Sequence, residues 1–173
     1  MIPALFLGPL VVEERPPVPV VPERAPTAVA PYGTAGSMET SVWAGVAASS
    51  AAVGGQAGGD FGWFFANGFE LSALGGLAYV HPGGAEVIGS VLAEPSVHIA
   101  FGSSVMGFTG LGGGLTFSSS GAGFELSQRV GVNVLFGKHG STGILTPAIA
   151  LAYVTNAPAI TSVGAVVGYG LAW

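Results

Sequence analysis

Large and small side chains alternate along much of the chain, most clearly in its last stretch, TSVGAVVGYGLAW. One parity carries large apolar residues, and the other carries glycine, alanine and serine. Successive side chains of a strand point to opposite faces, so this period of two predicts a β-strand. In a soluble sheet the second face would meet water and carry long polar side chains, which this strand lacks. The large apolar positions are Val163, Val167, Tyr169, Leu171 and Trp173.

Turn signals recur every 12 to 20 residues from Met38 onward, for example at ANG, HPGGA, SSSGAG and TNAPA. Glycine, proline, asparagine and serine in such clusters mark reversals between strands. Each intervening segment has about ten residues or more, enough for a tilted strand to cross a bilayer. Seven turns therefore predict eight strands, at 38–49, 56–65, 68–80, 86–101, 103–118, 123–136, 143–154 and 160–173.

The charged residues within these segments all fall on the parity opposite to the large apolar one. A charge on a lipid-facing position near the bilayer centre costs about 2–4 kcal/mol for Arg or Lys, so the separation predicts an apolar exterior and a polar lumen. In the first strand this assignment points Trp43 inward. The inward set is Glu39, Asp60, Glu70, Glu86, Glu94, Glu125 and Arg129.

Aromatic residues gather at the predicted strand ends, as expected where rings meet lipid headgroups. With an even number of strands, both termini lie on one side of the membrane, which we expect to be the periplasm. One girdle then holds Phe65, Phe69, Phe101, Phe136 and Trp173, and the other holds Tyr79, Phe117, Phe124 and Tyr153.

The composition favours a membrane-spanning β-barrel over other classes. Only 8% of the 173 residues are charged, against about 25% in an average soluble domain. The 30 glycines and 12 prolines interrupt every long apolar run, which leaves a closed barrel as the spanning structure. A net charge of −5 with four Lys and Arg disfavours a nucleic-acid partner. The absence of cysteine excludes disulfides and thiolate metal sites.

Residues 1–37 differ from the rest and include the proline-rich run EERPPVPVVPERAPTAVAP. This composition predicts a disordered, extended periplasmic arm. Its opening MIPALFLGPLVV resembles part of a signal peptide without the positive n-region. Two roles stay open for the arm: an unstructured tail, or a segment that contacts a periplasmic or membrane partner or enters the barrel.

The alternation over residues 38–173, the hairpin GWFFANGFELSALGGLAYV and the terminal aromatic resemble the small eight-stranded outer-membrane β-barrel proteins of Gram-negative bacteria, the OmpA/OmpX-like class. The resemblance implies an all-β, antiparallel up-and-down barrel in outer-membrane lipids. It also implies that the barrel-assembly machinery reads the last strand, through Val163, Val167, Tyr169, Leu171 and Trp173. The predicted outer connections are short, which disfavours a receptor or adhesin.

Several inward polar residues predict a network inside the lumen. An eight-stranded barrel is just wide enough for side chains to fill. Arg129 would be the hub, paired with Glu125, Glu94 or Glu70. A narrow polar pore is the alternative use of the same residues. The predicted set is Asp60, Glu70, Glu94, His98, Glu125, Arg129 and Asn133.

Catalytic and cofactor roles are disfavoured. Glu94, Ser96 and His98 suggest an esterase, but residues two apart on a strand have Cβ atoms about 7 Å apart, which we expect to prevent a Ser–His bond, and no GxSxG motif is present. His81 and His139 are predicted at opposite membrane faces, so they cannot share a metal. The GLGGG run has no following helix and is not a phosphate loop. We therefore expect no enzyme activity and no cofactor.

The sequence favours a structural or scaffold barrel in the outer membrane, with a narrow pore for ions or small solutes as the alternative. A third interpretation is a soluble, lipocalin-like ligand barrel. It requires the opposite parity, with the aromatics inside and Glu70, Glu125 and Arg129 outside.

Overall fold

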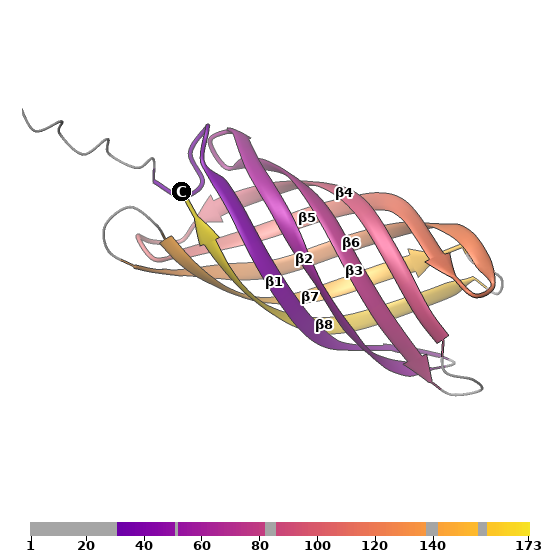
Figure 1. The fold of residues 1–173 in the computed structure, drawn as a ribbon. Coiled ribbons are helices and arrows are strands. Elements are labelled where there is room, and N and C mark those ends of the chain that lie inside the picture. Colours follow the sequence, from indigo (N-terminus) through magenta and orange to yellow (C-terminus); the bar gives the residue numbers. More distant parts are fainter. Residues whose placement is uncertain (1–30, 51, 82–85, 138–141, 156–158) are drawn as a thin grey trace, which may run out of the picture.

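The computed structural model describes residues 31–50, 52–81, 86–137, 142–155 and 159–173. Its elements are eight strands that form one elongated barrel (Figure 1). No helix among the described residues is long and apolar enough to cross a membrane. The strands are β1 (Met38–Ser49), β2 (Val53–Ala66), β3 (Phe69–His81), β4 (Glu86–Ala100), β5 (Val105–Ser118), β6 (Gly121–Phe136), β7 (Thr142–Val154) and β8 (Ile160–Ala172).

The sheet closes on itself in sequence order, and every neighbouring pair is antiparallel. β1 pairs with β8 from Glu39 opposite Ala172 to Ser49 opposite Ser162. Beyond this ladder, the Met38 N–H donates to the Trp173 carbonyl at 2.9 Å, and the Trp173 N–H donates back at 3.0 Å. The closed sheet therefore leaves no unpaired edge, which a bilayer interior requires.

The predicted all-β, eight-stranded barrel is confirmed, and most strand limits lie within two residues of the expected ones. The largest difference is at β2, which begins at Val53 rather than at residue 56. Gly54 and Gly55 resemble the glycines of a turn cluster, but they pair with both β1 and β3. Only backbone groups form the hydrogen bonds between strands, so glycine is tolerated in a strand that has a paired strand on each side.

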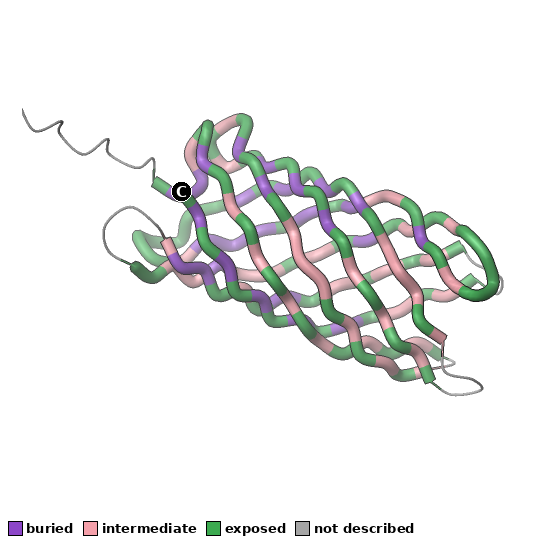
Figure 2. Tube along the Cα trace, viewed as in Figure 1, coloured by how far each residue is buried: buried purple, intermediate pink, exposed green. Residues whose placement is uncertain are grey.

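The exterior is apolar, and the predicted parity is confirmed. Exposed and less exposed residues alternate along most of each strand (Figure 2). Phe61, Leu77 and Ile99 are 48%, 62% and 60% exposed. Every Asp, Glu and Arg within the described strands lies on the inward parity. The polar residues on the outer face are Thr40, His81, Thr109, Gln128 and Thr161. The soluble, lipocalin-like interpretation is wrong, because it needs the aromatic residues inside.

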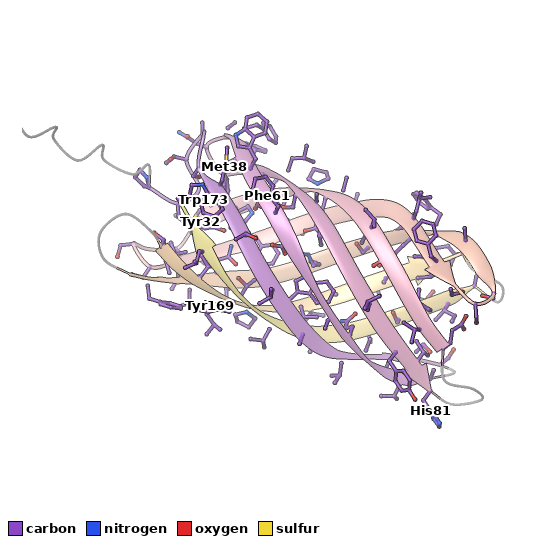
Figure 3. The ribbon with its side chains drawn as sticks, in the orientation of Figure 1. Tyr32, Met38, Phe61, His81, Tyr169 and Trp173 are labelled. Carbon is purple, nitrogen blue, oxygen red and sulfur yellow. The ribbon has the colours of Figure 1, made fainter. Side chains whose placement is uncertain are left out.

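The two ends of the barrel can be distinguished by the chain termini. We call the end with Met38 and Trp173 the terminal end, and the opposite end, where His81 lies, the far end (Figure 3). At the terminal end, the rings of Phe65 and Phe69 lie 6.3 Å apart between centroids, next to Trp63. Aromatic side chains thus gather at the terminal end, where one of the two girdles is predicted. That this end faces the periplasm stays a prediction.

The predicted limit of the arm at residue 37 is wrong, because residues 31–37 form an ordered turn against the terminal end. The Gly36 N–H donates to the Phe64 carbonyl at 2.7 Å, and the Phe64 N–H donates to the Ser37 carbonyl at 2.9 Å. Gly33 and Gly36 have φ of 83° and 91°, a region open to glycine. Tyr32 is consequently buried at 9% exposure. The prediction of disorder for residues 1–30 lies outside the described residues.

Candidate functional site in the barrel lumen

An apolar layer closes the lumen at the terminal end. Tyr32 packs edge-on against Phe64, with ring centroids 5.1 Å apart, and the Asn133 side-chain amide donates to the Tyr32 hydroxyl oxygen at 2.7 Å. Burial, together with the neighbouring Glu39 carboxyl, raises the pKa of the Tyr32 phenol, so the phenol stays protonated. We call this layer the terminal seal; its members are Tyr32, Phe64, Met106, Ile144 and Ala172.

Further along the lumen from the seal lies an ion cluster centred on Arg129. Its Nε donates to Glu94 Oε2 at 2.9 Å, and its Nη2 donates to Glu94 Oε1 at 2.7 Å. Its Nη1 lies 3.5 Å from Asp60 Oδ2, and Asp60 also accepts a bond from the Ser41 hydroxyl at 2.7 Å. The guanidinium carbon sits 5.8 Å from the centre of the Phe108 ring. The bidentate Arg129–Glu94 salt bridge offsets part of the free-energy cost of burying these charges.

His98 organises a second polar cluster beside the first. Its Nε2 lies 2.7 Å from Glu70 Oε2 and 2.9 Å from the Ser96 hydroxyl, and the Ser72 hydroxyl donates to Glu70 Oε1 at 2.6 Å. The expectation that Ser96 and His98 are too far apart is wrong, because the imidazole reaches back along the strand and Cβ spacing does not limit it. Serine and carboxylate nevertheless share one ring nitrogen, whereas a catalytic triad uses both.

Glycines of β5 make room for the ion cluster. Glu94 belongs to β4 and Arg129 to β6, so their side chains meet across β5, where Gly110 pairs with Arg129. A Cβ at Gly110 would overlap the Glu94 carboxylate, and one at Gly112 would lie 2.5 Å from Ser127 Oγ. The GLGGG run therefore serves packing: its inward glycines leave space for a salt bridge.

Beyond the ion cluster, the far half of the lumen holds a cavity of about 140 Å³. Trp43 lies across its floor, against the backbone of Gly58 and Gly76, which explains how this large ring fits inside. The Trp43 Nε1 and Ser127 Oγ atoms are buried with no hydrogen-bond partner among the described residues. Glycine, alanine and serine make up half of the lining residues, and the others include Leu74, Leu92, Gln56 and Glu125.

Comparison with known proteins bears on the fold. No protein-family model and no curated protein matches the chain. Among solved structures it is similar to Neisserial surface protein A (NspA), with a TM-score of 0.59 and 15% identity over 79% of this chain and 94% of that one. The chain has the fold of the small outer-membrane β-barrels. It is also similar to OprG of Pseudomonas aeruginosa, with a TM-score of 0.52 and 13% identity over 81% of this chain and 97% of that one.

This outer-membrane barrel fold brings most of the predicted lumen residues together. Arg129 forms a salt bridge with Glu94, which is one of its three predicted partners. Glu70, another predicted partner, contacts His98 instead. Glu125 lies apart, in the wall of the far cavity. The residues gathered in the two polar clusters and at their border with the seal are Asp60, Glu70, Glu94, His98, Arg129 and Asn133.

Sequence reasoning missed several members of this barrel's interior. Ser41, Ser72 and Thr146 have the inward parity, which could have identified them. The Thr146 hydroxyl donates to the side-chain Oδ1 of Asn133 at 2.8 Å. Tyr32 gave no such signal, because it lies in a proline-rich stretch with no strand period. His139 lies outside the described residues, and the part of the chain that the structure describes contains no group of three His, Asp or Glu suited to a metal ion.

Proposed function

We propose that the chain is a non-enzymatic integral protein of a Gram-negative outer membrane that acts as a structural barrel with a closed lumen. The observation that carries this proposal is the presence of two closures in series, the terminal seal and the Arg129 ion cluster. Phe64 and Glu94 are both fully buried, at 0% exposure of the residue. The apolar exterior suits the lipid, and the fold is that of known outer-membrane barrels.

The absence of enzyme activity in this proposal is supported by the histidine cluster. Ser96 and Glu70 compete for the same nitrogen of His98, so the imidazole cannot be held by the carboxylate while it takes a proton from the serine. All three side chains are also buried. A substrate carbonyl therefore has no position next to the Ser96 oxygen.

The competing function is a narrow pore, and conductance separates the two. The full chain, refolded in detergent and inserted into planar bilayers, should give no unitary current steps. A large-bore porin in the same bilayers is the positive control. The mobility shift between boiled and unboiled samples on SDS gels would show that the tested protein is folded. Regular steps from the folded wild-type chain would overturn the closed-barrel proposal.

A Tyr32→Ala variant tests whether the ion cluster closes the lumen when the terminal seal is weakened. We expect it to remain silent as well, because the ion cluster still blocks the lumen behind the seal. Tyr153→Ala, on the outer face at the far end, is a matched control for loss of an aromatic side chain. Conductance in Tyr32→Ala alone would show that the seal is the sole closure.

We further propose that both termini face the periplasm and that the barrel-assembly machinery recognises Val163, Val167, Tyr169, Leu171 and Trp173. These side chains are all exposed on the outer face of β8. Trp173→Ala retains the backbone bonds to Met38, so refolding in detergent should be unchanged while the folded fraction in cell envelopes falls. Tyr153→Ala should affect neither quantity. Equal envelope levels for both variants would contradict the recognition role. Contact between residues 1–37 and a periplasmic partner stays a prediction.

A further inference from the structure

The far half of the lumen has features that the closed-barrel function does not use. The cavity there has about 140 Å³ and extends to Ser49, Val154 and Ile160, where β1, β7 and β8 reach the far end. An apolar cavity of about 150 Å³ in a protein interior accommodates a benzene molecule. The space therefore matches a ligand body of roughly one aromatic ring or a short alkyl chain.

The floor of the cavity is apolar and preformed. Leu74 and Leu92 are buried at 6% and 7% exposure, and they line the cavity together with the Trp43 ring, which lies against the backbone of Gly58 and Gly76. Trp43, Leu74 and Leu92 give the closed end of the pocket an apolar surface beside the Arg129 side chain. An apolar group placed against this floor would lose its contact with water.

The charge of the cavity selects for a cation. Arg129 reaches the floor, but its guanidinium already faces two carboxylates, those of Glu94 and Asp60. Glu125 lies in the wall with no hydrogen bond or ion pair to any described residue that would neutralise it. An anionic ligand would meet an excess of carboxylates, whereas a cation would pair with Glu125.

A second polar group lies beside Glu125. Ser127, two residues along β6, points to the same side of the strand. It is buried at 7% exposure, and its hydroxyl has no partner among the described residues. Buried polar atoms are normally hydrogen-bonded. An ammonium group carries three N–H donors, so one that bonds to Glu125 also has a donor for the Ser127 oxygen.

We propose that this cavity binds a small primary amine, whose positive nitrogen pairs with Glu125 and whose apolar body, about the size of one aromatic ring, packs on Trp43, Leu74 and Leu92. The ligand enters from the far end and stops at the ion cluster. This inference goes beyond the structural role and requires only the folded barrel.

Calorimetric titration of the refolded full chain with benzylamine tests the proposal, with empty micelles as the blank for partitioning. Benzyl alcohol and benzoate have the same ring with a neutral and a negative group. Benzylamine should bind saturably with one site per chain, and at least about tenfold more tightly than either analogue, as expected for a charge-assisted hydrogen bond. The absence of a saturable signal above the blank, or equal binding of benzyl alcohol, would overturn the proposal.

Two variants locate the site. Glu125→Gln removes the charge with little change of shape and should weaken benzylamine binding about tenfold. Glu86→Gln is the matched control, because Glu86 does not line the cavity and accepts bonds from Ser119 and Ser120 at 3.3 Å. Equal affinities for Glu125→Gln and wild type would refute the pairing.

Filling the cavity provides an independent measurement. Ala152 lines the wall, and Ala152→Leu should abolish binding by occupying the space. If that variant lacks the folded, heat-modifiable band, Ala78→Leu on the opposite wall replaces it. Retained binding in a folded, filled variant would show that the amine sits elsewhere. Silent bilayers together with failed binding would leave the closed barrel intact and reject only the amine site.

Discussion

Arg129 holds the charges of the lumen together. Within the described strands it is the only Arg or Lys, while six carboxyl groups have the inward parity, those of Glu39, Asp60, Glu70, Glu86, Glu94 and Glu125. The Arg129 and Glu94 side chains are 15% and 1% exposed. A carboxylate buried to this degree depends on its partner, since water is not available to replace it.

Replacing Arg129 with methionine should destabilise the barrel by about 3–5 kcal/mol, because Glu94 and Asp60 would be left buried without a counter-charge. Urea unfolding in lipid vesicles, followed by tryptophan fluorescence, measures this change. The double variant Arg129→Met, Glu94→Gln should recover part of the loss, since both partners are then neutral. A single variant as stable as wild type would mean that the ion pair contributes nothing net.

The parity of the sequence predicted which residues face the lumen, but it did not predict their partners. Asp60 was not expected to contact Arg129, and Glu125 was expected to be a candidate partner. Pairing depends on how far each strand is shifted relative to the next around the barrel. Residues directly opposite in the ladder are therefore staggered along the lumen. That offset comes from three-dimensional closure, which a one-dimensional pattern does not contain.

At the scale of elements, β5 acts as a spacer between β4 and β6. Its inward positions Gly110 and Gly112 carry no side chain, so the Glu94 carboxylate lies against the β5 backbone and meets Arg129 on the other side. Glycine weakens a strand when considered alone. Here the loss is balanced by a salt bridge that crosses an intervening strand.

Gly110→Ala should therefore destabilise the barrel by about 1–3 kcal/mol, because the new methyl group overlaps the Glu94 carboxylate in a packed interior. Gly113→Ala is the matched control on the same strand: its Cβ would lie 3.5 Å from the Phe124 ring, an ordinary contact on the outer face. Urea midpoints of the two variants in the same vesicles give the comparison. Similar midpoints would contradict the spacer role.

The strands themselves were predictable because each one alternates over ten or more residues. The ordered turn at residues 31–37 was not. The turn is stabilised by one buried tyrosine and by backbone bonds to Phe64. The neighbouring sequence is rich in proline and has no strand alternation, so it does not indicate this contact. A single buried residue produces no periodic pattern in the sequence, so its contact is seen only in the folded structure.

At the scale of the whole molecule, polarity is inverted relative to a soluble barrel. Large apolar residues cover the outside and carboxylates occupy the inside. The alternation and the scarcity of charge made this predictable from the sequence alone. The far cavity was not predictable, since its volume depends on how the side chains of all the strands fill the interior.

An arginine placed on the outer face should be costly in a depth-dependent way. Val130 and Val87 have similar exposure, 52% and 55%, but Val130 lies near the middle of β6 and Val87 at the far end of β4. Val130→Arg should lose about 2–4 kcal/mol in lipid vesicles and Val87→Arg about 0–1 kcal/mol. Equal losses would argue against a bilayer centred on the barrel.

The pairing of β1 with β8 also constrains how the barrel forms. β1 and β8 pair along their length, from Glu39 opposite Ala172 to Ser49 opposite Ser162, so the sheet cannot close until both strands are present. Contacts between distant parts of a sequence form slowly, because the connecting chain must lose its freedom before they contribute. Any folding intermediate without β8 would expose two strand edges that invite aggregation. The pairing of β1 with β8 is therefore the contact that closes the barrel, and it joins the first strand of the sheet to the last.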